Sequence, residues 1–184
     1  MDYGLDRRAR DGGFAVAGIA DPGRVTAPLD LLRWPGSRSR LQLDVDKALQ
    51  EIRAVYHDLA KRPVERNCLR VKECCHFKLT GRTPYLTKGE ALLAAKAIRA
   101  TGRSRLPENA TGACPLLDSP TGNCLIYDSR PFGCRTHFCA AAGGPYARRE
   151  VIDLIRRLEV VDAQVGGSGP RLLQNAVADA LAEL

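Results

Sequence analysis

Apolar side chains recur at steps of three and four residues between positions 44 and 60. They are Val45, Leu49, Ile52, Val55, Tyr56 and Leu59. This spacing puts them on one face of an α-helix. Asp44 and Asp46 would lie in the first turn, where the helix dipole favours acids, and Pro63 would follow the last turn. The pattern predicts a helix over residues 44–60.

A second helix is indicated over residues 88–101 by signals at both of its ends. Thr87 and Glu90 have the spacing of a capping box, in which each side chain accepts a hydrogen bond from the other residue's backbone N–H. Alanine and leucine fill the segment that follows. Gly102 suits the C-terminal cap, because glycine adopts the left-handed conformation required there.

Two amphipathic helices are predicted at the C-terminus, over 146–165 and 171–183. Their apolar stripes are Val151, Ile155, Leu158, Val161 and Val165, and then Leu173, Ala176, Val177, Ala180 and Leu184. Arg149, Asp153 and Arg157 stand four residues apart, a spacing that predicts ion pairs along the outer face of the first of these helices. The stripes pack either on the domain's own core or on a second copy of the chain, and the sequence leaves both alternatives open.

Residues 1–40 show no comparable periodicity. Glycine, proline and a Ser-Arg-Ser-Arg run interrupt them, apart from a short candidate strand at 14–19. We therefore expect a poorly ordered N-terminal arm over 1–40, which Trp34 anchors to a single helical domain over 41–184.

The cysteines fall in two groups within that domain. Cys68, Cys74 and Cys75 precede the second helix, and Cys114, Cys124, Cys134 and Cys139 follow it. Proline and glycine break the second group, where Leu125-Ile126-Tyr127 is either a single strand or a buried turn. Such loops would hardly hold their shape without a metal or a cross-link. The predicted fold class is mainly α: a small helical domain around a loop-rich cysteine knot, with at most one short strand pair.

The absence of certain apolar segments bears on where in the cell the protein is found. The N-terminus lacks the apolar stretch of a signal peptide, and no apolar run reaches the length of about 18 residues that a membrane span needs. We therefore expect a cytoplasmic protein with reduced thiols and no membrane partner.

The net charge is +7, and residues 61–105 hold twelve Lys or Arg side chains against three acids. This segment is either a solvated face or a patch for nucleic acid or another acidic partner.

Thiolate ligands indicate a soft metal: zinc, copper(I) or an iron–sulfur cluster. Structural zinc sites usually show repeated short C-x₂₋₄-C pairs, whereas only Cys134 and Cys139 have such a spacing here. The adjacent pair Cys74-Cys75 suits a larger cluster better than one ion, and the Cys114-Pro115 step also occurs at ferredoxin ligands. These features favour an iron–sulfur cluster first and zinc second. Seven cysteines exceed the ligands of one site, so His137 and His76 are further candidate ligands.

The second cysteine group carries a family resemblance. Cys114-Pro115, the run from Cys124 to Arg135 that reads CLIYDSRPFGCR, and Cys139 follow the pattern of the YkgJ-like cysteine-cluster proteins. These are described as zinc- or iron-chelating domains with a CxxCxxCC signature. Cys68, Cys74 and Cys75 hold three of the four signature positions, and Val71 stands at the remaining one.

The resemblance covers about residues 68–140 and implies metal binding, often as an iron–sulfur cluster, without a defined activity. It also singles out Arg130, Arg135 and Tyr127, which we expect beside the ligands. Guanidinium groups there would offset the negative charge of metal-bound thiolates or bind an anion, and we favour the first role.

Three functions remain open at this stage. The first is a metal or cluster protein with a structural, sensing or carrier role. The second is a metal- or cluster-dependent redox or group-transfer enzyme. The third is a basic nucleic-acid-binding module stabilised by metal. The sequence specifies neither a substrate nor an oligomeric state.

Overall fold

The structure is a computed structural model that describes residues 40–62, 66, 72–108 and 112–184. The expectations for the 1–40 arm, its strand at 14–19 and Trp34 lie outside the described residues. So do Cys68 and Val71.

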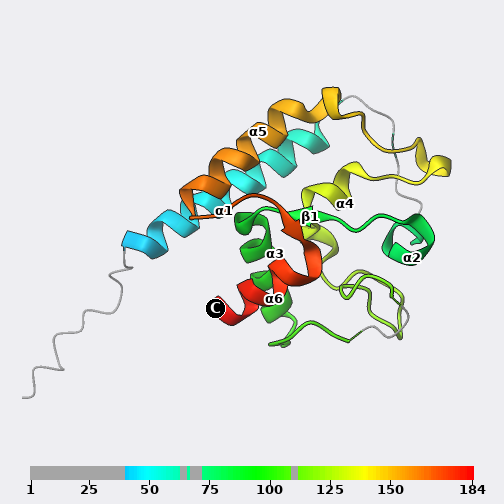
Figure 1. The fold of residues 1–184 in the computed structure, drawn as a ribbon, viewed down its shortest axis with the longest axis horizontal. Helices are drawn as coiled ribbons and strands as arrows, with labels where there is room; N and C mark the ends of the chain where they lie inside the picture. Colours follow the sequence, from blue (N-terminus) through cyan, green and yellow to red (C-terminus); the bar gives the residue numbers. More distant parts are fainter. Residues whose placement is uncertain (1–39, 63–65, 67–71, 109–111) are drawn as a thin grey trace, which may run out of the picture. The chain divides into compact units, whose positions relative to one another are not determined.

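The described residues confirm a mainly α fold (Figure 1). Its α-helices are α1 (Arg40–Ala60), α2 (Phe77–Thr80), α3 (Lys88–Ala100), α4 (Phe132–Thr136), α5 (Arg148–Gln164) and α6 (Leu173–Glu183). The 3₁₀ turns are η2 (Glu73–Cys75), η3 (Tyr127–Ser129) and η4 (Ala140–Ala142). The strands are β1 (Tyr85–Leu86) and β2 (Arg171–Leu172). The four longer helices build the core, and the short ones belong to the cysteine-bearing loops.

Helix α1 begins four residues before the predicted start. The expected placing of Asp44 and Asp46 in its first turn is therefore wrong, because that turn holds no acid. The apolar stripe itself is confirmed, since Leu49, Ile52 and Val55 are buried. The apolar periodicity indicates only the part of a helix that is buried. Helix α1 begins before that part, so the pattern placed its start too late.

Helices α1 and α5 lie side by side and antiparallel (Figure 1). Val151, Leu154 and Leu158 are buried on the α5 side of this contact. The ion pairs that we predicted along the outer face of α5 form across to α1 instead. Arg157 contacts both Glu51 and Asp58 at 2.7 Å. A carboxylate on a neighbouring helix competes with a carboxylate four residues away on the same helix. Here the carboxylates of α1 lie close enough to pair with Arg157.

Helix α3 is the centre of the core and packs against α1, α5 and α6. Its capping box is present as predicted. A Cβ atom at Gly89 would stand 2.6 Å from Cδ1 of Ile52, so glycine at this position allows the close approach of α1. Ala176 and Val177 of α6 are buried as well. Both C-terminal stripes thus contribute to the domain's own core.

The only sheet in the described part of the chain is the antiparallel pair of β1 and β2. Its register joins Tyr85 to Leu172 and Leu86 to Arg171. Residues 171–172 therefore belong to β2 and not to the last helix, for which the sequence predicts 171–183. Strands of two residues are too short for an alternating pattern, so only the tertiary pairing reveals them.

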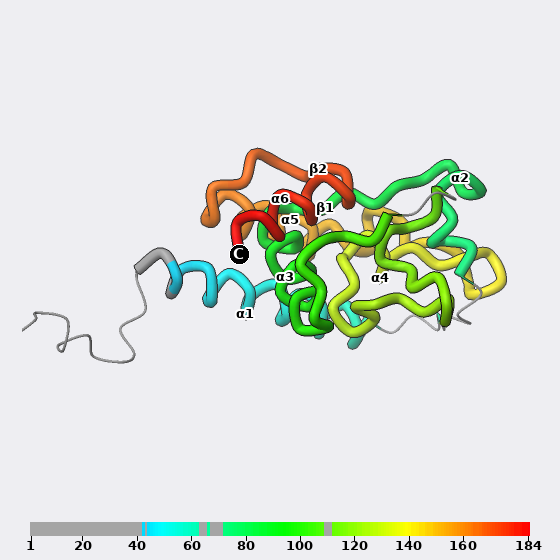
Figure 2. Tube along the Cα trace, turned by 90° about the horizontal axis from the view of Figure 1, so that it is seen from below, coloured from blue at the N-terminus to red at the C-terminus, as the bar shows by residue number. Residues whose placement is uncertain are grey.

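Leu125 and Ile126 form a turn that leads into η3, which begins at Tyr127, and Ile126 is buried. Figures 1 and 2 both place α2, α4 and the neighbouring loops at one end of the helical layer. Among the described helices, none is long and apolar enough to cross a membrane.

Candidate metal centre

The first wall of the site is the turn η2, which carries Cys74 and Cys75. Lys72 precedes it in the left-handed conformation, with φ 67°. The Cys75 N–H donates to the Lys72 carbonyl at 2.8 Å. This tight turn leaves the two sulfur atoms 4.0 Å apart, so both thiols face the same region.

The second wall is a small hairpin between residues 114 and 125. The Cys114 N–H donates to the Cys75 carbonyl at 2.6 Å, which joins the two cysteine groups across a long stretch of sequence. A bridge between Leu117 and Cys124 and a hydrogen bond from Leu125 N–H to the Leu116 carbonyl close the hairpin. Cys114 and Cys124 therefore lie near each other although ten residues separate them.

The third wall is the short helix α4, which carries Cys134. The buried carboxylate of Glu90 fixes its first turn by accepting a hydrogen bond from Phe132 N–H at 2.8 Å. Arg135 holds the other side, because its Nε donates to the Arg130 carbonyl at 2.7 Å and its Nη2 to the Asp128 carbonyl. Its guanidinium also lies 4.3 Å above the ring of Tyr56. Arg135 thus stabilises the loop that contains Asp128 and Arg130, and it does so from outside the cavity.

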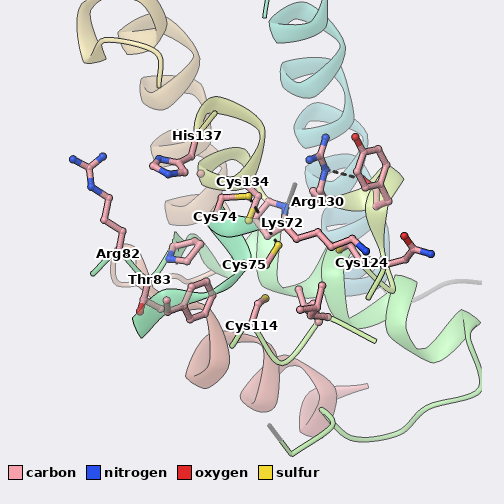
Figure 3. A pocket seen from close by; sticks show the side chains of 18 of the residues that line it. Lys72, Cys74, Cys75, Arg82, Thr83, Cys114, Cys124, Arg130, Cys134 and His137 are labelled. Carbon is pink, nitrogen blue, oxygen red and sulfur yellow. Dashed lines mark hydrogen bonds between the residues drawn. The ribbon is translucent and has the colours of Figure 1, made fainter. Parts of the chain in front are cut away.

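These walls enclose one cavity of about 420 Å³. Five of the six described cysteines line it: Cys74, Cys75, Cys114, Cys124 and Cys134. Figure 3 shows the thiols of the η2 turn and of α4 in the centre, with Cys114 and Cys124 on the hairpin side. The two cysteine groups of the sequence therefore meet in space, as their clustering predicted.

Burial raises the pKa of the Cys114 thiol to about 12, and it raises the pKa values of Cys124 and Cys134 too. Backbone N–H groups nevertheless point at the sulfurs: those of Leu116 and Leu117 donate to Cys114. Ile126 N–H likewise donates to Cys124. Such donors stabilise a thiolate, and the thiolate is the form that binds a metal.

Arg130 supplies positive charge to the same wall. Its guanidinium lies 3.9 Å from the ring centre of Tyr127, and its Nε donates to the Tyr127 carbonyl at 3.1 Å. The charge of Arg130 acts to lower the pKa values of Cys74, Cys124 and Cys134 against the effect of burial. Arg130 and Tyr127 both line the cavity, whereas Arg135 does not.

The two candidate histidines differ in position. His137, at the end of α4, lines the cavity. Burial, with a smaller effect of Arg82, lowers its pKa, which favours the neutral imidazole that metals bind. His76 follows η2 and is absent from the lining, as is Cys139, which caps η4.

The donor set fits a thiophilic metal or cluster, since five thiols, stabilising N–H donors and a cation share one cavity. No three His, Cys, Asp or Glu side chains of residues 40–62, 66, 72–108 and 112–184 stand in an arrangement that would hold a single metal ion. The residues that would hold the group are the five lining cysteines, with His137 beside them.

Sequence reasoning did not single out Lys72, Arg82 and Gly122, which are among the residues that line the cavity. In the sequence, Lys72 and Arg82 stand out only as members of the basic segment 61–105. Their positions depend on how η2 and the segment before β1 fold back, so no local pattern distinguishes them from exposed lysines and arginines.

Residues 67–153 match the model of the CxxCxxCC family, which is described as a "putative zinc- or iron-chelating domain". The match includes both cysteine groups, and it confirms the resemblance seen in the motif. Over these residues the chain is therefore similar to this family of cysteine-rich domains. No curated protein and no solved structure matches the chain.

Proposed function

We propose that this protein holds an iron–sulfur cluster in the cysteine-lined cavity and serves as a sensing, carrier or structural cluster protein of the cytoplasm. Cys74, Cys75, Cys114, Cys124 and Cys134 are the ligand candidates supported by the cavity. Cys68 and Cys139 complete the set suggested by the sequence. When bound, such a cluster accepts and donates single electrons.

The size of the cavity is the observation that carries this proposal. A zinc ion with four thiolates at about 2.3 Å is enclosed by its own ligands. The cavity of about 420 Å³, which five thiols line together with other side chains, is larger than such an ion requires. A cluster distributes its irons among the thiolates and fills more of the space, which supports iron–sulfur over zinc.

The surrounding chain supports the same group. Hydrogen bonds from backbone N–H groups to ligand sulfurs are one of the means by which a protein tunes a cluster. Leu116, Leu117 and Ile126 provide such donors. Arg130 adds a cation that offsets the negative charge of several thiolates.

A metal- or cluster-dependent enzyme is the second candidate, and one observation favours it. The cavity extends beyond the thiols to Arg82, Thr83 and Asn123, which leaves room for a small molecule beside the metal. Redox or group-transfer chemistry on such a molecule is the corresponding reaction class.

Purification without oxygen, followed by a visible spectrum and analysis of iron, acid-labile sulfide and zinc, tests the proposal. We expect coloured protein with iron and sulfide in matching amounts, and loss of both on Cys124→Ser. Zinc without sulfide would instead make the site a zinc centre. Unchanged metal content in C124S, together with an unchanged melting temperature, would rule out this cavity as the metal site.

A further inference from the structure

The cavity is lined by more positive charge than its walls neutralise. Lys72, Arg82 and Arg130 line it, against the single carboxylate of Asp128. In the described part of the chain, none of these three cations forms an ion pair. By contrast, Arg62, Lys96 and Arg157 outside the cavity each contact a carboxylate.

Arg130 is held in place with its charged end available. The stacking on Tyr127 and the hydrogen bond from Nε to the Tyr127 carbonyl fix the plane of the guanidinium. This bond uses Nε alone, and Arg130 lines the cavity. The planar fork of a guanidinium group matches the oxygen atoms of a carboxylate or phosphate group.

Lys72 lies on the same side of the cysteine group as Arg130, as Figure 3 shows, and extends across the cavity toward Cys124. Its backbone has φ 67°, which is unfavourable for a side chain other than glycine and recurs at functional sites. A Cβ atom at Gly122 would stand 2.7 Å from Nζ of Lys72. The hairpin therefore leaves room for the Lys72 ammonium group. This close approach is a second indication that the fold holds Lys72 in a defined position.

The thiols account for only part of this charge. Arg130 acts on the thiols of Cys74, Cys124 and Cys134, whereas Arg82 acts on the imidazole of His137. Leu116, Leu117 and Pro131 give the cavity an apolar floor. The space between Lys72, Arg130 and this floor thus has the character of a site for a small organic anion.

We propose that the cavity binds the oxyanion group of a small molecule, a carboxylate or phosphate, between the Lys72 ammonium and the Arg130 guanidinium, beside the thiols. This inference deepens the proposed function, because it names the ligand class of the same cavity and rests on that function for the neighbouring cluster. The anion contacts the two cations and requires no bond to the metal.

Titration calorimetry of the full chain against inorganic phosphate and against citrate tests this proposal. We expect saturable binding of at least one of them, weakened about tenfold in Lys72→Gln and in Arg130→Gln, as the loss of one charge-assisted contact predicts. Lys47→Gln, an exposed charge of α1 that does not line the cavity, is the matched control and should leave the affinity within about twofold. Binding of phosphate alone indicates a phosphate-bearing ligand, and binding of citrate alone a carboxylate.

Absence of saturable binding, or an equal loss of affinity in K47Q, would overturn the proposal. If R130Q does not fold, K72Q decides the matter alone. Iron and sulfide are measured in the same samples, so the two hypotheses fail separately. Anion binding to protein without metal refutes only the cluster, and a full cluster without anion binding refutes only the anion site.

Discussion

The carboxylate of Glu90 accepts a hydrogen bond from the backbone N–H of Phe132 at 2.8 Å, and this contact joins the helical core to the cysteine loops. Its Oε1 also accepts from the Tyr56 hydroxyl at 3.0 Å, and its Oε2 accepts from the backbone and side chain of Thr87. Four donors thus satisfy one fully buried carboxylate. Burial raises the pKa of Glu90, while these donors act in the opposite direction.

Glu90→Gln tests this junction. Each carboxylate oxygen of Glu90 accepts from two donors, and the NH₂ group of a glutamine side chain would face one of these pairs without being able to accept. We therefore expect a loss of about 1–3 kcal/mol in the free energy of unfolding. Metal content should fall as well, because α4 carries Cys134. Urea denaturation and metal analysis measure the two effects. Tyr56→Phe removes a single donor and should cost less, and equal stability of E90Q and wild type would contradict the argument.

Cys134 and Cys139 have the spacing of a metal-binding pair, yet only Cys134 lines the cavity. We therefore expect Cys134→Ser to lose most of the bound metal and Cys139→Ser to keep more of it. Metal analysis of both variants, purified side by side without oxygen, gives the comparison. A larger loss in C139S would show that Cys139 turns into the site when metal binds.

Gly122 should be required for the position of Lys72. Gly122→Ala introduces a Cβ atom 2.7 Å from Nζ, in a residue with φ +61°. Gly81→Ala is a matched control, because its φ is +64° and no atom lies within 4 Å of the added Cβ. We expect phosphate or citrate binding to weaken in G122A and to persist in G81A. Affinity as high in G122A as in wild type would show that the contact at Gly122 does not position Lys72.

The ion pair between Arg157 and Asp58 predicts a pH dependence of stability. The hydrogen bond from Arg157 lowers the pKa of Asp58 below its ordinary value of 3.8. A carboxyl with a depressed folded-state pKa stabilises the fold above the unfolded value of about 3.9 and loses this contribution as the pH falls through the folded value.

The melting temperatures of wild type and Asp58→Asn should therefore differ most near neutral pH. The difference should narrow as the pH falls from about 5 to about 3. Both side chains are only partly buried, so the effect is expected to be smaller than that of E90Q. A constant difference over this range would exclude the pair as its source.

The basic segment 61–105 uses much of its charge internally. Arg62, Lys88, Lys96 and Arg103 contact Asp153, Glu183, Asp46 and Asp118, respectively. We therefore expect only weak binding of DNA or RNA, lost between about 50 and about 200 mM salt. Fluorescence anisotropy with labelled duplex and single strands measures it. Tight, sequence-selective binding at the higher salt concentration would revive the nucleic-acid hypothesis.

Local signals in the sequence determined the longer helices and the kind of chemistry. The three- and four-residue stripe around Ile52 and the capping box at Thr87 depend on contacts within a few residues, so they are readable without a fold. The clustering of cysteines and the motif from Cys124 to Arg135 likewise indicated a metal-binding unit. These features need only the order of residues along the chain.

Only the tertiary structure decided which segments of the chain contact each other. The hydrogen bond from Cys114 to Cys75 and the pairing of Tyr85 with Leu172 join segments that are distant in sequence. Glu90 looked like half of a capping box, and the fold gave it Phe132 and Tyr56 as further partners. Lys72 gained its position only through the turn and hairpin around it. Contacts of this kind depend on how separate elements pack, and no periodicity within one element encodes that packing.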